Sequence, residues 1–289
     1  MEHLILPDGR VLEYLVEGPA TAIPLVLHHG TPSGTVRYAP VVDAVLAGGF
    51  RFVQASRPGY ASSTPRPGRR VADVAADTAA LMDALDAPAF VTVGWSGGGP
   101  HALACAALLP GRCRAAATIA AVAPYDAKGL HWLSGMGEEN VQEFGAAVAG
   151  AEQLDAFLIP AAAGMSEVKP ADLVEAFGDL ISEVDRRTLA GGLADYLAAS
   201  FRAAVREGIA GWRDDDLAFV ADWGFRLEEI RVPLSLWQGD QDRMVPFAHG
   251  AWLAAQLPTA EAHLVPGEGH LSLLSNFTTI VSDLRRFAS

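Results

Sequence analysis

The chain has 289 residues, of which 51% are hydrophobic and 19% are charged, so it can bury a large core, and extensive disorder is excluded. Its net charge of −13 repels phosphate backbones and anionic lipid headgroups, which argues against nucleic-acid and membrane partners. The N-terminal segment lacks the basic region of a secretory signal, and no apolar run reaches the ~20 residues that span a bilayer, so we expect a cytoplasmic protein.

The first part of the chain alternates short apolar runs with helical patterns, the order expected of an α/β sheet. Residues 3–6 and 11–16, joined by a Pro-Asp-Gly turn, predict an antiparallel hairpin. Further buried strands are expected at residues 24–28, 52–55, 89–93 and 115–120. Helices are expected at residues 39–46, 71–85 and 101–109. The basic residues Arg66, Arg69 and Arg70 are interrupted by prolines and a glycine, and predict a solvated loop.

The second part contains about a hundred residues without a convincing strand. Helical patterns there are broken by glycine or proline at Gly129, Gly164, Pro170, Gly191, Gly192 and Gly211. Strand character returns at residues 232–237 and 262–265, with helices expected at 247–257 and 278–287. We therefore divide the chain into a core, formed by residues 1–124 and 226–289, and an inserted all-helical segment, residues 125–225.

A glycine-rich turn separates the strand at 89–93 from the helix at 101–109. Its sequence, Gly94-Trp95-Ser96-Gly97-Gly98, matches the nucleophile elbow G-x-S-x-G, in which glycines leave room for a sharply turned serine. The elbow requires a buried strand before it and a helix after it, and both are predicted here. Ser96 is therefore the candidate nucleophile. The structural alternative is a serine that only caps the helix.

A serine hydroxyl needs a histidine to take its proton and a carboxylate to orient that histidine. His270 lies in a loop bracketed by glycines, just after the last predicted strand, where the strand ends would place it beside the elbow. The other histidines that follow in sequence, His131, His249 and His263, fall in the insertion, a helix and a strand. His101, near the start of the helix after the elbow, is expected to be packed.

Two aspartates compete for the role of the carboxylate, since Asp240 and Asp242 both follow the strand at 232–237. The surrounding segment resembles the acid loop of the α/β-hydrolase family, G-x-x-D-x-x-V-P. This resemblance selects Asp242, and Asp240 is then expected to form a turn through its own backbone two residues on.

Two further segments resemble the same family. His29-Gly30-Thr31-Pro32 is similar to its H-G-x-P oxyanion loop, which implies that the backbone N–H groups of Thr31 and Gly97 stabilise the oxyanion. Residues 56–63 are similar to its structural segment D-R-P-G-Y-G-x-S, from which Ser56 and Ala61 depart. Together the motifs imply an α/β-hydrolase fold: a mostly parallel eight-stranded sheet flanked by helices, with the insertion as a helical cap.

The resemblance implies a serine hydrolase that cleaves an ester or amide of a small, apolar substrate through an acyl-enzyme, most simply a carboxylesterase. We expect substrate contacts from His29, Trp95, Trp132 and Met136. No metal is expected, because no His/Asp/Glu cluster has ligand spacing, and no cofactor is expected, because the turn at 97–99 lacks the lysine of a phosphate loop. A homodimer is compatible with the sequence.

Other activities of the family stay open. Proline iminopeptidases hold a substrate amino group with cap acids, a role that Glu138 and Glu139 could take, although solvated helix acids are the simpler reading. Cofactor-free haloperoxidases, hydroxynitrile lyases and C–C bond hydrolases keep a serine triad. Haloalkane dehalogenases and epoxide hydrolases are disfavoured, because they have an aspartate in place of Ser96. Some members of the family are non-catalytic hormone receptors, which the complete triad argues against.

Overall fold

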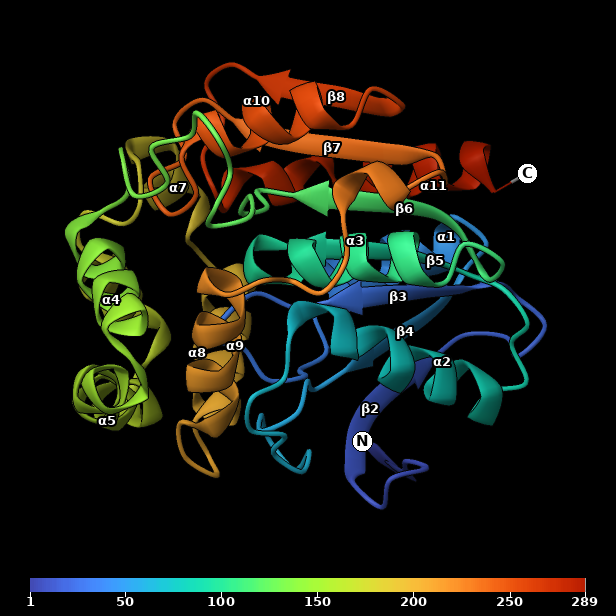
Figure 1. The fold of residues 1–289 in the computed structure, drawn as a ribbon, viewed down its shortest axis with the longest axis horizontal. Helices are drawn as coiled ribbons and strands as arrows, with labels where there is room; N and C mark the ends of the chain where they lie inside the picture. The colour runs from blue at the N-terminus through green and yellow to red at the C-terminus, as the bar shows by residue number, and fades with distance from the viewer. Residues whose placement is uncertain (289) are drawn as a thin grey trace.

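The computed structural model describes residues 1–288 and is built around one eight-stranded sheet (Figure 1). The strands are β1 (Glu2–Ile5), β2 (Val11–Glu17), β3 (Pro24–His28), β4 (Arg51–Ala55), β5 (Phe90–Trp95), β6 (Cys113–Ile119), β7 (Leu234–Gly239) and β8 (Ala260–Val265). Their order is β1-β2-β4-β3-β5-β6-β7-β8, and all neighbours from β4 to β8 are parallel. The predicted mostly parallel sheet is confirmed.

The central strands are buried on both faces. Every residue of β3, β5 and β7 is buried, which explains why these strands are continuous apolar runs in the sequence rather than alternating ones. The N-terminal hairpin pairs antiparallel as predicted, with Leu4 opposite Leu12. β5 continues through Gly94 and Trp95, beyond the predicted end of the strand, and delivers the chain directly to Ser96.

Helices cover both faces of the sheet (Figure 1). The core helices are α1 (Ala39–Ala47), α2 (Val74–Ala84), α3 (Gly99–Leu108), α10 (Phe247–Gln256) and α11 (Phe277–Phe287). Helices α1 and α11 pack together on one face, whereas α2, α3 and α10 cover the other. The predicted helix at 71–85 begins with a 3-10 turn, Val71–Asp73, before α2 starts.

The segment between β6 and β7 contains helices and loops but no strand. Its helices are α4 (Glu138–Ala149), α5 (Ala151–Glu167), α6 (Leu173–Phe177), α7 (Glu183–Thr188), α8 (Gly192–Ala204) and α9 (Ala210–Val220). We call residues 125–225 the cap. Its helices lie beyond the carboxyl ends of the parallel strands, where the loops of the core converge (Figure 1).

Two of the expected helix breaks are wrong, because Gly164 lies inside α5 and Gly211 lies inside α9. Gly211 serves close packing instead. A Cβ on Gly211 would come within 2.6 Å of the Tyr60 ring, so the glycine lets α9 lie directly against the loop after β4. Tertiary packing of this kind overrides the low helix propensity of glycine.

Both cysteines, Cys105 and Cys113, are buried and free. None of the helices in residues 1–288 is long and apolar enough to cross a membrane. Within the same residues, no three His, Cys, Asp or Glu side chains gather in a way that could hold a metal ion.

Candidate active site

Ser96 lies in a strained turn between β5 and α3. Its φ of 56° is in the left-handed region, which residues other than glycine rarely adopt. The turn is so tight that a Cβ on Gly94 would overlap the carbonyl oxygen of Gly98, and a Cβ on Gly98 would overlap that of His28. The two glycines are therefore required, and Ser96 is held at the carboxyl edge of the sheet.

The loop after β3 packs against this turn. An ideal Cβ on Gly97 would lie 2.8 Å from the Cβ of Thr31, and one on Gly30 would lie 3.4 Å from the Cβ of Ser96. The pairing of β3 with β5 brings these segments together, because it aligns His28 with Gly94. Thr31 and Gly97 thus flank the serine, as the oxyanion-loop resemblance implies.

His270 and Asp242 form a buried pair. Nδ1 of His270 lies 2.9 Å from Oδ2 of Asp242. The aspartate is fixed in turn, because its Oδ1 accepts hydrogen bonds from the backbone N–H groups of Met244 (2.9 Å) and Val245 (2.8 Å). Burial disfavours the charged form of His270, but Asp242 outweighs it and raises the pKa of the imidazole above its ordinary value.

Asp240 does not share this arrangement. Its side chain is on the surface, and its Oδ1 accepts a hydrogen bond from the N–H of Gly267 at 2.8 Å rather than from its own backbone two residues on. The turn expected of Asp240 is instead made by Asp242, through its bonds to the two N–H groups that follow. The geometry therefore brings Asp242, and not Asp240, to His270.

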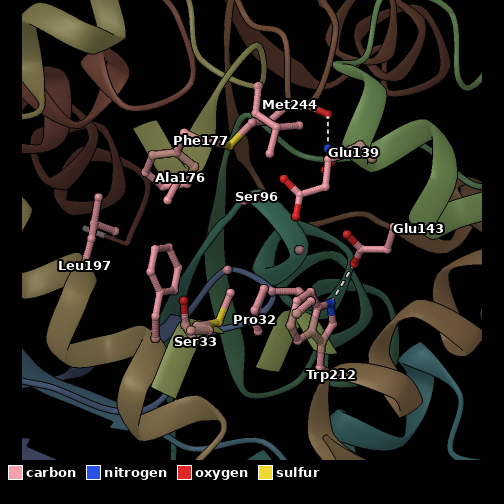
Figure 2. A pocket seen from close by; sticks show the side chains of 18 of the residues that line it. Pro32, Ser33, Ser96, Glu139, Glu143, Ala176, Phe177, Leu197, Trp212 and Met244 are labelled. Atoms are coloured by element: carbon pink, nitrogen blue, oxygen red, sulfur yellow. Dashed lines mark hydrogen bonds between the residues drawn. The ribbon is translucent and has the colours of Figure 1, made fainter. Parts of the chain in front are cut away.

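A cavity of about 530 Å³ opens between the core and the cap (Figure 2). Ser96 and His270 both line it, together with Thr31 and Gly97. The apolar part of its wall includes Phe144, Met165, Phe177, Leu197, Phe201 and Phe219. The serine and the histidine therefore face the same mainly apolar cavity, which can hold a small molecule.

Three of the four expected substrate contacts are absent from the cavity wall. Trp95 lines it, but His29, Trp132 and Met136 do not. The Trp132 indole donates to the carbonyl of Ala123 at 2.7 Å, and its ring packs against Phe144 of α4. His29 is buried within the oxyanion loop, and its Nδ1 is 2.8 Å from the carbonyl oxygen of Gly30. The contacts of His29 and Trp132 are thus hydrogen bonds within the protein, and Met136 is buried.

Five cap residues with carboxyl groups also line the cavity: Glu139, Glu143, Glu167, Asp172 and Asp216. Glu143 is buried and accepts a hydrogen bond from the Trp212 indole at 2.6 Å, as Figure 2 shows. Burial and the nearby Glu143 raise the pKa of Asp216 well above its ordinary value, so the two groups do not both ionise. Glu138, the other acid considered from the sequence, does not line the cavity.

The sequence did not reveal a buried ion-pair network behind the oxyanion loop. Its centre is Asp215 of α9, which is fully buried and lies 2.5 Å from Arg57 Nη2 and 2.6 Å from Arg69 Nη1. The hydroxyls of Thr31 (2.7 Å) and Tyr60 (2.9 Å) also donate to this carboxylate. Although burial opposes its ionisation, the two arginines hold the pKa of Asp215 well below its ordinary value.

This network corrects one expectation. Arg69 is not part of a solvated loop, because its side chain is buried against Asp215. Arg57, in the segment taken as structural, also donates to the carbonyl oxygens of His29 (2.5 Å) and Gly30 (3.1 Å), and so fixes the oxyanion loop.

His101 is packed, as expected, with its Nε2 3.4 Å from Asp215, and burial lowers its pKa to about 4.

The eight-stranded sheet, the serine at the strand-to-helix turn and the buried His–Asp pair after the last strands define an α/β hydrolase. A family model described as alpha/beta hydrolase fold matches residues 23–277, and the chain belongs to this family.

Its relatives carry different activities. The chain is 32% identical over 266 residues to a non-heme chloroperoxidase of Streptomyces lividans, covering 91% of this chain and 89% of that protein. It is 31% identical over 285 residues to a pimeloyl-[acyl-carrier protein] methyl ester esterase of Xanthomonas campestris pv. campestris (strain B100), covering 96% and 98%. Among solved structures, an esterase of Thermogutta terrifontis matches with a TM-score of 0.72 at 18% identity, and both chains are covered completely (100%). These matches identify a hydrolase-fold enzyme with esterase-like and haloperoxidase-like relatives.

The Asp215 network predicts a large effect on stability. In Asp215→Asn, Arg57 and Arg69 lose the carboxylate that compensates their burial, so we expect the free energy of unfolding to fall by ~3–5 kcal/mol. Urea unfolding followed by tryptophan fluorescence measures this loss. The matched control is Asp195→Asn, at an exposed position of α8, for which we expect a change within about 0.5 kcal/mol. Equal stabilities of the two variants would contradict the prediction.

Proposed function

We propose that the protein is a serine esterase in which Ser96 is the nucleophile, His270 the general base and Asp242 the residue that orients His270. The observation that carries the proposal is that Ser96 and His270 line one cavity while Asp242 holds the Nδ1 of His270. With Nδ1 bonded to a carboxylate, the neutral imidazole keeps Nε2 free to accept a proton.

The proposed reaction has two halves. Ser96 Oγ attacks the carbonyl carbon of the ester while His270 Nε2 takes the hydroxyl proton. The alcohol then leaves with that proton, and an acyl-enzyme remains on Ser96. Water, deprotonated by the same imidazole, attacks the acyl-enzyme and releases the acid. The backbone N–H groups of Thr31 and Gly97 stabilise the negative oxygen of each tetrahedral intermediate.

An uncharged ester with an apolar acyl group suits the cavity best. Aromatic and aliphatic side chains form much of the wall, including Phe177 and Phe219, and each methylene buried there contributes ~0.8 kcal/mol to binding. The name of the Xanthomonas relative, a methyl ester esterase, is consistent with ester cleavage. No metal or cofactor takes part in this proposal.

A second candidate is an aminopeptidase of the proline iminopeptidase type. It is favoured by the carboxyl groups of Glu139 and Glu143, which line the same cavity as Ser96 and could receive a substrate's amino group (Figure 2). The ester proposal ranks first, because Glu143 is already bonded to Trp212 and because burial beside it raises the pKa of Asp216, so that the two carboxyl groups do not both ionise.

The other expectations from the sequence stay predictions. The chloroperoxidase relative is consistent with a cofactor-free haloperoxidase as another candidate activity. The labelling experiment below distinguishes a receptor from an enzyme, and the substrate that is turned over distinguishes a lyase or a C–C hydrolase. The division into a core (1–124 and 226–289) and a cap (125–225) is likewise a proposal, as are a homodimer and a cytoplasmic location. Ser289 lies outside the described residues.

Covalent labelling tests the nucleophile directly. A fluorophosphonate should form an adduct on Ser96 of the wild-type protein, identified by peptide mass spectrometry. Ser96→Ala should not be labelled, and its kcat/KM for p-nitrophenyl esters should fall by about 10⁴-fold or more, because covalent catalysis is lost. Circular dichroism checks that the variant is folded. An unlabelled, folded wild-type protein would favour a receptor and refute the esterase proposal.

A substrate panel tests the apolar cavity. We expect kcat/KM for p-nitrophenyl butyrate to exceed that for the acetate by about tenfold, because two more methylenes are buried at ~0.8 kcal/mol each. L-Proline p-nitroanilide serves as the comparison substrate and should be cleaved far more slowly. A preference for the anilide, lost in Glu143→Gln, would replace the ester proposal by the aminopeptidase candidate.

The raised pKa of His270 predicts the pH dependence. The base must be neutral, so activity is lost as pH falls through the pKa of the folded protein. This pKa is raised above the ordinary 6.5. We therefore expect kcat/KM to rise with pH and to reach half of its maximum at a pH above 6.5. Asp242→Asn removes the main group that raises the pKa, and its residual activity should titrate at lower pH. A midpoint below 6.5 in the wild-type protein would contradict the assignment.

A further inference from the structure

A second carboxylate, in addition to Asp242, holds the loop that carries His270. Asp185 belongs to α7 of the cap and is fully buried. Its Oδ1 accepts hydrogen bonds from the backbone N–H groups of Leu271 (2.8 Å) and Ser272 (3.0 Å), and its Oδ2 accepts one from that of His270 (3.0 Å). One side chain therefore binds three successive N–H groups, starting at the candidate base itself.

Asp185 is itself firmly placed. The Ser182 hydroxyl donates to its Oδ2 at 2.9 Å, in a capping arrangement at the start of α7. The partners of this buried carboxylate are thus backbone N–H groups and a hydroxyl instead of a lysine or arginine. Such charge-assisted bonds are about twice as strong as neutral ones, and each oxygen is used. Most of the hydrogen bonds that Asp185 accepts therefore come from the His270 loop.

The loop is shaped to receive this carboxylate. An ideal Cβ on Gly269 would lie 2.5 Å from Cγ of Asp185, so only a glycine permits the approach. The turn is closed on its other side, because the N–H of Gly269 donates to the Ser272 hydroxyl at 2.8 Å. Gly269, which in the sequence indicates only a loop, is thus the residue against which the Asp185 side chain packs.

The two aspartates bind different parts of His270. Asp242, from the loop after β7, binds the ring at Nδ1, whereas Asp185, from the cap, binds the main chain. Trp95 of β5 packs on the ring with a centroid distance of 5.7 Å and adds no charge. Asp242 and Asp185 are therefore the charged groups that face His270, and both favour its protonated form.

The same stretch of the cap also reaches the substrate. Leu180 lines the cavity only two residues before Ser182, which holds Asp185. One short segment of the cap therefore both lines the cavity and supplies the carboxylate that binds the His270 loop.

We propose that Asp185 is a positioning residue: its carboxylate holds the His270 loop in the conformation that lets Nε2 take the proton of Ser96. This inference rests on the proposed function, in which His270 is the base. It assigns to the cap a part in proton transfer, in addition to shaping the substrate cavity.

The test compares two variants of α7 in the full-length protein. Asp185→Asn cannot accept all the N–H groups, because its amide nitrogen is a donor. We expect kcat for p-nitrophenyl butyrate to fall by on the order of 10-fold to 100-fold, because the base is misplaced, with KM nearly unchanged. The acid limb of the pH profile should move to lower pH. Glu183→Gln, which removes an exposed charge from the same helix, should leave both unchanged.

A merely structural role would leave the pH profile in place, so an unchanged limb and kcat in folded Asp185→Asn overturn the proposal. If that variant fails to fold, Ser182→Ala, which removes one bond to Asp185, takes its place and should show the same changes to a smaller degree. NMR titration of the His270 ring reads its pKa without substrate. An unlabelled wild-type protein in the fluorophosphonate experiment refutes the esterase, whereas a labelled one with an unaltered variant refutes only Asp185.

Discussion

The close approach of three backbone segments at the turn after β5 is the constraint on which the site depends. Gly94 and Gly98 leave no room for side chains against each other and against His28, so β3, β5 and α3 meet at one point. Ser96 is held there with a positive φ that only dense surroundings can sustain. Because the neighbouring strands are parallel, the loops that carry Thr31, Asp242 and His270 end at the same edge of the sheet.

Around this fixed point, the cap contributes more than a wall. Asp215 of α9 holds the oxyanion loop through Arg57 and Thr31, and Asp185 of α7 holds the loop of His270. Both carboxylates are fully buried. Asp215 is bonded to side chains of the core, whereas Asp185 is bonded to backbone N–H groups of the core. The cap is thus joined at two separate points to the core loops that carry Thr31 and His270.

Much of this arrangement could be predicted from the sequence, because local signals specify it. The buried strands are apolar runs, and the elbow and the His270 loop are marked by glycines. Asp242 was selected over Asp240 only through the family resemblance, since both follow the same strand. Asp185 and Asp215 could not be found in this way: an acid in a helical pattern is usually solvated, and its partner is decided by tertiary packing. The same reason explains Trp132 and Gly211, whose roles depend on neighbours far away in the chain.

The bond between Thr31 and Asp215 joins residues 184 positions apart. Contacts of such separation form late, because the loop that they close has a large entropic cost. Thr31, Arg57 and Arg69 all lie in the first quarter of the chain, yet they lack their buried carboxylate until α9 has been synthesised and docked. One hydrophobic cluster, which includes Val26 and Leu103 of the core and Phe144 and Phe219 of the cap, forms across the same boundary. The two parts therefore gain their native structure together, and a chain truncated before α9 leaves Arg57 and Arg69 without their partner.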